Sequence, residues 1–306
     1  MIHKNGSCTI VIFFVLFLSG CSDPRVSPPT YIPNPTAAAR KTLASSELDT
    51  KNPDIPFDIK DRNKDGMKMV YVPIERDNAA GTRSLQEDSI HIAGQPTIPL
   101  NPYWIDMYEV SNHQFSLCLS TGICKESDYI YDEKFKNGDL PAVAVTWNEA
   151  ENYCHWVGGR LPTEVEWRFA AQGPEQRIYP WGNQFDGEKA NFCDINCQFN
   201  FRHTGYDDGH NTTAPMGSYP DGASWVGAMD MAGNVREWVS DFYPTSYYTN
   251  PAQSDADLSE MDSYRGAWGG NWLNQSSDLR TDSSLIVLRE YQSTYIGFRC
   301  VMDSNQ

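Results

Sequence analysis

The sequence is short of basic charge. It has 24 Lys and Arg against 40 Asp and Glu in 306 residues, a formal net charge of −16. This argues against nucleic-acid binding, because phosphates need a cationic counter-surface. A mean hydropathy of −0.53 argues against a protein with many membrane spans. The chain is also not of the disordered class, since 40% of its residues are hydrophobic and only 21% are charged.

The one unbroken long apolar run lies at the N-terminus. Thr9–Leu18 follows Lys4, and it is too short for a membrane span but suits the apolar core of a signal peptide. The segment Leu18-Ser19-Gly20-Cys21 resembles the lipobox of bacterial lipoproteins. The resemblance implies cleavage before Cys21 and its lipidation, which would anchor the chain to a membrane. The alternative is an ordinary secretory signal with a chance cysteine.

These features predict three parts of the chain. Residues 1–20 are the signal peptide, and residues 21–60 are the lipidated cysteine with a flexible tether rich in Pro, Ser, Thr and Ala. Residues 61–306 are the folded domain. Ser22, and not Asp, follows the lipidated cysteine, and by resemblance to enterobacterial lipoproteins this implies sorting to the outer membrane. We therefore predict a lipid-anchored protein of the bacterial cell envelope, facing the periplasm or the surface.

The cysteines indicate disulfides. Of the eight, Cys8 lies in the signal peptide and Cys21 takes the lipid, which leaves six in an exported, oxidising compartment. Six thiols allow fifteen pairings. A zinc site is the rival interpretation, but the thiols do not form two CxxC pairs. Short spacings favour two local bridges, and elimination leaves a long one: Cys118–Cys124, Cys193–Cys197 and Cys154–Cys300.

Local signals predict an α+β chain with much irregular structure. Three capping boxes mark helix starts, at Ser111-x-x-Gln114, Thr146-x-x-Glu149 and Thr163-x-x-Glu166. The predicted stops lie near Gly122, at Gly158-Gly159 and before Gly173-Pro174. Strand-like segments occur at 69–74, 103–110, 142–145, 264–270 and 296–301.

Six segments occur in an order that resembles the formylglycine-generating enzyme family, also called the sulfatase-modifying factor domain. They are YWIDMYEVSNHQF, PAVAVTWNEAENYCHWVGGRLPTEVEWRFAA, YPWGN, GAMDMAGNVREWVSDFY, GGNW and GFRCV. The resemblance extends from about Met67 to Met302. It implies a fold similar to C-type lectins, with small sheets, few helices and long ordered loops. It also implies a bridge between the cysteine of the second helix and that of GFRC, in agreement with Cys154–Cys300.

The oxidase chemistry of that family needs copper. The family holds Cu(I) by two thiolates that follow a GGSW-like segment, and Cu(I) needs such soft ligands. Here the segment is Gly269-Gly270-Asn271-Trp272, and the two thiolate positions fall on Asn274 and Leu279. No cysteine lies between Cys197 and Cys300. We therefore predict that copper is not bound and that formylglycine is not made by the known mechanism.

Calcium is the metal that the resemblance supports, and hard oxygen ligands in an acidic protein suit it. The first implied site uses the side chains of Asp230 and Glu237 with the carbonyls of Gly233 and Val235. The second uses the side chains of Asn191 and Asp208 with the carbonyls of Phe192 and His210. Iron has weaker support, because the only histidine pair of interest is His203 and His210, on either side of Asp207-Asp208.

Two other acidic motifs favour structural roles. Asp61-x-Asn63-x-Asp65-Gly66 resembles half of an EF-hand loop, but its twelfth position is Val72, so we interpret it as a turn. Glu164 and Glu166 could form an acid/base pair. However, Glu166 is the capping partner of Thr163, which favours a role at the helix start.

Aromatic and arginine side chains near the two thiolate positions are expected to line the former substrate groove. They are Tyr264, Arg265, Trp268, Asn271, Trp272, Arg280 and Arg289. The leading hypothesis is a binding or assembly module that meets an envelope protein, a peptide or a glycan. One alternative is an enzyme of the same superfamily that uses another metal or chemistry. The other is a calcium-dependent, saccharide-binding lectin-like module.

Overall fold

The computed structural model describes residues 58–74, 100–126, 132–243 and 264–305. They belong to one compact unit that lies within residues 52–306. The predicted signal peptide and Cys21 lie outside the described residues. The first strand begins at Ile59, just before the predicted domain boundary at residue 61. None of the helices in the described part of the chain is long and apolar enough to cross a membrane.

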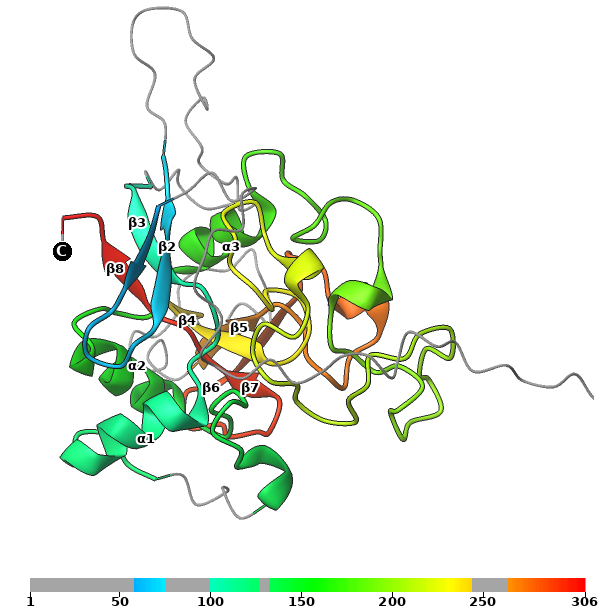
Figure 1. Ribbon diagram of the computed structural model, residues 1–306, viewed down its shortest axis with the longest axis horizontal. Coiled ribbons are helices and arrows are strands. Elements are labelled where there is room, and N and C mark those ends of the chain that lie inside the picture. The colour runs from blue at the N-terminus through cyan, green and yellow to red at the C-terminus, as the bar shows by residue number, and fades with distance from the viewer. Residues whose placement is uncertain (1–57, 75–99, 127–131, 244–263, 306) are drawn as a thin grey trace, which may run out of the picture. The chain divides into compact units, whose positions relative to one another are not determined.

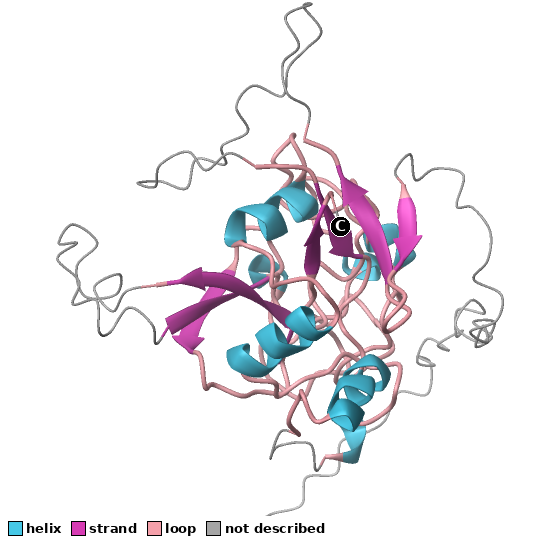
Figure 2. Ribbon diagram, turned by 90° about the vertical axis from the view of Figure 1, so that its left-hand side faces the viewer, coloured by secondary structure: helices cyan, strands magenta, loops and turns pink. Residues whose placement is uncertain are grey.

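The strands form two four-stranded sheets, which Figure 2 shows as separate groups. The first sheet is antiparallel, in the order β1 (Ile59–Asp61), β2 (Lys68–Val72), β3 (Tyr103–Asp106), β8 (Val301–Asp303). The second has the order β6 (Ser284–Leu288), β5 (Tyr264–Trp268), β4 (Arg236–Phe242), β7 (Ile296–Gly297), and β7 pairs with β4 in parallel.

Strand β2 lies between two apolar clusters. Successive side chains of a strand point to opposite faces of its sheet. Accordingly, Met69 packs in a cluster with Tyr153 of the second helix, whereas Val70 and Val72 pack in another cluster with Trp167 of the third helix. The face of the first sheet that carries Val70 and Val72 is fully buried, whereas the face that carries Met69 is buried only in part, because Tyr71, Trp104 and Met302 are partly exposed.

The predicted strand at 296–301 is wrong as one element, because it is split between the two sheets. Its first part is β7 and its last part begins β8, and Figure 1 shows these two strands in different sheets. The link between them is Phe298–Cys300, which is fully buried. This link therefore connects the two sheets and brings Arg299 and Cys300 into the centre of the fold.

The three helices confirm the capping-box predictions. They are α1 (Asn112–Thr121), α2 (Trp147–Trp156) and α3 (Glu164–Gln172). Ser111, Thr146 and Thr163 are the N-caps, and each box makes both of its reciprocal hydrogen bonds. Glu166 therefore has the capping role predicted for it.

The strand predicted at 142–145 is wrong. The segment is buried, as its apolar residues require, but Ala144 has a φ of 56°, which interrupts extended backbone. Its amide groups bond to loops instead, from Ala142 to the Val110 carbonyl and from Ala144 to the Ser293 carbonyl. The segment at 103–110 is extended as a strand only to Asp106, while β1, β4 and β6 were not predicted.

Between α3 and β4 the described chain contains no strand of the two sheets. Its regular pieces there are two short 3₁₀ turns, Gly187–Lys189 and Pro220–Gly222; the others in the described residues are Glu133–Phe135 and Ser276–Asp278. An apolar cluster holds this long region in place, with Tyr179, Phe192 and Ala232 packed against Leu279. The long loops are therefore ordered by side-chain packing.

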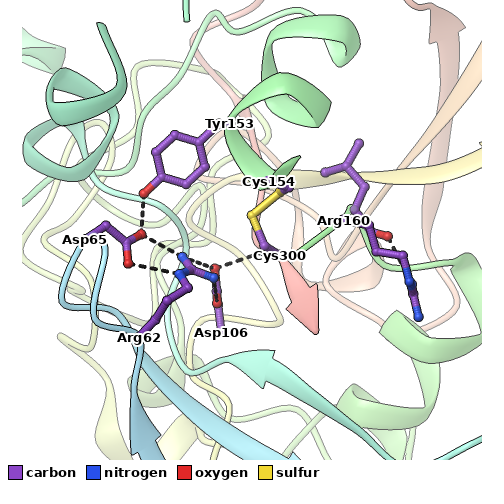
Figure 3. The surroundings of a disulfide bond; sticks show 8 residues. Arg62, Asp65, Asp106, Tyr153, Cys154, Arg160 and Cys300 are labelled. Atoms are coloured by element: carbon purple, nitrogen blue, oxygen red, sulfur yellow. Dashed lines mark hydrogen bonds and ion pairs between the residues drawn. A yellow bond between two sulfur atoms is a disulfide. The ribbon is translucent and has the colours of Figure 1, made fainter. Parts of the chain in front are cut away.

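The acidic motif at 61–66 is the turn between β1 and β2, as predicted. Arg62 donates to both oxygens of Asp65 and also to Asp106, with Nη1···Oδ1 of 2.6 Å in the latter pair (Figure 3). Tyr153 of α2 donates to Asp65 at 2.5 Å. The carboxylate of Asp65 is thus occupied by protein donors, which supports the structural interpretation of this motif.

Candidate functional site

The two positions implied to have carried thiolates lie in the loop between β5 and β6. Gly269 and Gly270 open this loop with φ angles of 100° and 73°. A Cβ atom on Gly270 would lie 2.6 Å from the carbonyl oxygen of Asp278, so the loop folds back on itself where only glycine fits. This close turn brings Asn274 and Leu279 against the long region between α3 and β4.

Both positions are occupied by packing and hydrogen bonding. Leu279 is fully buried in the cluster with Tyr179 and Phe192. The Asn274 carbonyl accepts a hydrogen bond from the Cys193 amide at 3.0 Å, and its Oδ1 accepts one from Arg236 Nη2 at 3.2 Å. The two residues therefore stabilise the loop.

Arg236 is a functional candidate that the sequence analysis missed. It is 6% exposed, and its guanidinium donates to neutral oxygens, those of Asn274, the Ser283 carbonyl and the Ser283 hydroxyl. Among the described residues no carboxylate lies within ion-pair distance of it. Burial lowers the pKa of Arg236 to about 10, against the opposing effects of Asp278 and Tyr295. The signal was the Arg of GNVREW, where the resemblance leads one to expect the Trp of GNVWEW.

The seven predicted groove residues are dispersed. Arg265, Trp268 and Asn271 are buried, and the Arg265 guanidinium lies 4.3 Å from the ring centre of Trp147. The others are partly exposed: Tyr264, Trp272, Arg280 and Arg289. Trp272 donates to the Thr294 carbonyl, Arg280 pairs with Asp282, and Arg289 pairs with Glu290. The structure therefore does not gather these side chains into one groove.

At the first implied calcium site, an arginine holds the carboxylate of Glu237. Arg299 Nε and Nη2 donate to its two oxygens at 2.6 and 2.7 Å, and Trp167 Nε1 donates to Oε2 at 2.7 Å. Three of the roughly four acceptor sites of a carboxylate are thus used by protein donors. This arrangement does not fit a cation at Glu237.

Two more buried acids adjoin this ion pair. Asp230 accepts from the Gly217 amide at 2.6 Å, and burial together with the charge of Glu237 raises its pKa to about 6 against the effect of Arg299. Burial and the charges of Asp230 and Glu237 also raise the pKa of Glu109 well above its usual range. Glu109 and Arg299 were not singled out from the sequence, although they lie in the YEVSN and GFRCV segments.

The second implied calcium site has the properties that the first lacks. Asp208 accepts from the backbone amides of Phe192 at 3.0 Å and His210 at 2.8 Å, so the structure brings these predicted residues together. Asn191 is 1% exposed, and its amide nitrogen donates to the Thr212 carbonyl and to Asn234. Its Oδ1 has no hydrogen-bond partner among the described residues. A buried oxygen without a donor fits a hard cation.

The charge around Asp208 supports the same fit. Burial raises the pKa of Asp208 to about 7, against the two backbone amides, and the neighbouring Asp194 raises it further. Asp194 is fully buried and accepts from the Asp208 amide. A bound cation would relieve this repulsion. In the described ranges no three His, Cys, Asp or Glu side chains are grouped to hold a metal, so such a site would depend on amide and carbonyl oxygens.

The histidine pair considered for iron remains a prediction that nothing in the geometry supports. His203 Nδ1 accepts from the Gly205 amide at 3.2 Å, and its ring packs 4.9 Å from Tyr206. His210 packs near Tyr219, with ring centres 6.5 Å apart. The contacts of both rings are therefore those of structural residues.

Every cysteine in the described part of the chain is bonded in a disulfide. The bridges are Cys118–Cys124, Cys154–Cys300 and Cys193–Cys197, which confirms the predicted pairing. No described thiol is therefore free to bind a soft metal or to form a mixed disulfide.

Two small sheets, short capped helices and long ordered loops, closed by a bridge from α2 to the C-terminal segment, define a formylglycine-generating-enzyme-like fold. The chain belongs to the family described as the Sulfatase-modifying factor enzyme 1-like domain, which matches residues 59–304.

Proteins with three different names are similar to this chain. The chain is 34% identical over 228 residues to serine/threonine-protein kinase Pkn1 of Chlamydia trachomatis. This alignment covers 67% of this chain and 34% of that protein. It is 36% identical over 171 residues to the formylglycine-generating enzyme of Streptomyces coelicolor, covering 54% and 53%. It is 33% identical over 175 residues to the inactive C-alpha-formylglycine-generating enzyme 2 of Mus musculus, covering 55% and 51%. The chain thus spans from 34% to 53% of the length of these relatives.

A solved structure shows the same fold. The PvdO protein of Pseudomonas aeruginosa matches with a TM-score of 0.57 and 24% identity, covering 80% of this chain and 98% of that one. At this identity the likeness concerns the fold alone.

Proposed function

We infer that this chain is an envelope lipoprotein whose domain acts as a binding or assembly module, and that it has lost the oxidase chemistry of formylglycine-generating enzymes. The observation that carries this inference is that the described part of the chain has no free cysteine thiol. Cu(I) needs thiolates, yet all described cysteines are in disulfides, and Asn274 and Leu279 take part in the packing of their loop.

The relatives are compatible with a role without catalysis. They include proteins named formylglycine-generating enzyme and one named inactive. Family membership alone therefore does not decide whether a protein is active. The residues at the site decide it. In this proposal the lipid on Cys21 and the tether of residues 21–60 attach the domain to the outer membrane, where it meets an envelope protein, a peptide or a glycan.

An oxygen-consumption assay tests the loss of oxidase activity. The mature chain is incubated with Cu(I) and a cysteine-containing peptide, beside the Streptomyces coelicolor relative as a positive control. We expect no oxygen uptake above that of the same mixture of Cu(I) and peptide without protein, and no aldehyde in the peptide by mass spectrometry, because no thiolate pair is available. Turnover by the wild-type chain would refute the proposal.

Gain of metal binding tests the assignment of the two positions. We expect the double variant Asn274→Cys/Leu279→Cys to compete for Cu(I) with a chelator, while the wild-type chain does not. Each single variant is the matched control, since one added thiolate cannot complete the pair. Equal Cu(I) binding by wild type and double variant would show that the positions are assigned wrongly.

We also propose a structural calcium ion at Asn191 and Asp208. Support comes from the unpartnered Oδ1 of Asn191 and from the half-buried carboxylate of Asp208 beside the buried Asp194. The ion would be held by these two side chains and by the carbonyls of Phe192 and His210. Its charge would hold together segments of the long loop region, in addition to the apolar packing and the Cys193–Cys197 bridge of that region.

Calcium content and affinity test this site. We expect about one calcium per chain after purification without chelator, and on the order of tenfold or more weaker binding in Asp208→Asn, since ligand charge sets affinity. The exposed Asp221 supplies the control variant Asp221→Asn, which should bind as wild type does. Isothermal titration at constant ionic strength makes the comparison. Absence of calcium, or unchanged affinity in Asp208→Asn, would contradict the site.

A further inference from the structure

A cavity of about 200 Å³ lies between α3, the segment that follows it and the loop before β6. It is lined on all these sides by arginine: Arg168 comes from α3, Arg177 from the following segment, and Arg280 from the loop. The other polar side chains of the lining are Gln172, Gln176, Thr281 and Asp282. Three guanidinium groups and one carboxylate thus line the cavity, and each arginine also pairs with an acid, Arg168 with Glu164, Arg177 with Glu175 and Arg280 with Asp282.

Hydrogen bonds from Thr281 to backbone carbonyls hold two walls of this cavity together. Thr281 donates from its amide to the Ile178 carbonyl at 2.9 Å and from its hydroxyl to the Arg177 carbonyl at 2.8 Å. These bonds join the two loops that carry Arg177 and Arg280. On the third side, Arg168 and Gln172 are one helical turn apart and share a face of α3. The cavity is therefore formed before any ligand binds.

Arg168 has a buried hydrogen-bond donor that lacks an acceptor among the described residues. Its guanidinium lies 5.3 Å from the ring centre of Trp268, and Nη1 makes a long contact of 3.3 Å with Glu164. Its Nε is buried and has no hydrogen-bond partner in the described part of the chain. A buried donor without an acceptor is unfavourable, so an acceptor group at this place would be stabilised.

The other two arginines have carboxylate partners that are open to water. Arg177 pairs with Glu175 and Arg280 with Asp282, and the acidic side chains are 65% and 47% exposed. Water screens exposed ion pairs and weakens them, but Arg280 binds both oxygens of Asp282, at 2.8 and 2.7 Å, and this geometry is favourable. Arg280 therefore keeps this pair and offers its remaining Nη1 group to an anion. The Arg177 guanidinium, paired with the exposed Glu175, can turn part of its donor set toward the anion.

We propose that this cavity binds an oxyanion, a sulfate or phosphate group, with Arg168 as its central donor. Guanidinium forks match the geometry of oxyanions and make short, charge-assisted hydrogen bonds to them. The volume lies below the range of pockets that take whole drug-sized ligands, so the cavity accepts a group and not a large molecule. The site is independent of the loss of oxidase activity, since none of its residues is Asn274 or Leu279.

Thermal denaturation and isothermal titration of the mature chain test the proposal. The probes are sodium sulfate and sodium phosphate, with sodium chloride at the same ionic strength as the reference. A ligand that binds the folded state raises Tm. We expect saturable binding of both oxyanions in the titration. Sulfate and phosphate also raise Tm through exclusion from the protein surface, so only a Tm rise that saturates with concentration supports the site. Absence of saturable binding would overturn the proposal.

Substitutions of the lining arginines test whether the oxyanion binds in this cavity. We expect Arg168→Gln and Arg280→Gln each to weaken sulfate binding about tenfold or more, the loss expected for one charge-assisted hydrogen bond. Arg280 is partly exposed, so Arg280→Gln keeps the test valid if Arg168→Gln does not fold. The control is Arg202→Gln, an exposed arginine on a distant part of the sequence, which should bind as wild type does. Unchanged binding in both Arg168→Gln and Arg280→Gln would refute the site.

The source of the oxyanion is resolved by comparing free ions with esters. Phosphoserine and glucose 6-sulfate present the same groups on a small carrier. Tighter binding of an ester than of its inorganic ion would support a modified protein or glycan as the ligand. Equal or weaker binding of the esters would support a free anion in the same cavity.

Discussion

Replacing Cys154 and Cys300 together by alanine should lower the free energy of unfolding by about 5 kcal/mol. The bridge closes a separation of 146 residues, and the chain-entropy account of cross-links gives its largest effects for such long loops. Both cysteines are fully buried, and the Cys300 amide donates to Asp106 at 3.0 Å, beside the ion pair of Arg62 (Figure 3). The bridge thus joins α2 to the link between the two sheets.

The short bridge between Cys118 and Cys124 is the matched control. It also joins well-buried cysteines, but the separation is 6 residues, for which the same account gives about 2 kcal/mol. Urea denaturation of the two double alanine variants measures both losses. Equal losses would contradict the chain-entropy explanation and would place the stabilisation in local packing.

Substitution of Arg299 by methionine should destabilise the fold by about 3–5 kcal/mol, the cost of breaking a buried ion pair on one side. Arg299 is fully buried and makes two hydrogen bonds to Glu237 of β4. It also donates to the carbonyls of Asp106 in β3, at 2.9 Å, and of Met107 and Met229. One side chain therefore connects the two sheets, and its loss leaves Glu237 buried beside Glu109 without a counter-charge.

A double variant and a surface control sharpen this test. Adding Glu237→Gln to Arg299→Met should recover part of the lost stability, because the uncompensated charge is then removed. Lys136→Met breaks the exposed pair with Glu133 and should cost less than about 1 kcal/mol. Denaturation curves at one pH give all the values. A loss in Arg299→Met no larger than in Lys136→Met would disprove the role of Arg299 as a connection between the sheets.

Local signals in the sequence predicted the parts of the fold that depend on near neighbours. Each capping box lies within four residues, so the starts of α1, α2 and α3 could be found without any tertiary information. The disulfide pairing followed from spacing and elimination. Apolar content alone was less informative: the segment 142–145 was predicted as a strand, but Ala144 interrupts it with a positive φ.

The candidate site was predicted only in part. The sequence pointed to Asn191 and Asp208, and the structure brings Asp208 against the backbone of Phe192 and His210. The lone Oδ1 of Asn191 could not be predicted, because it results from the other partners of that side chain. Arg236 was overlooked, because the change from the expected GNVWEW to GNVREW gains its meaning only once the burial of the side chain is known.

The sequence by itself determined the family, the helix starts, the disulfide pairing and the lack of thiolates at positions 274 and 279. These depend on residue identity, on short spacing and, for the long bridge between Cys154 and Cys300, on elimination. Only the tertiary structure decided which charges meet. Arg299 reaches Glu237, and Arg280 shares a cavity with Arg168, because chain segments 62 and 112 residues apart fold together. Such encounters are set by the packing of the whole core, which no local pattern encodes.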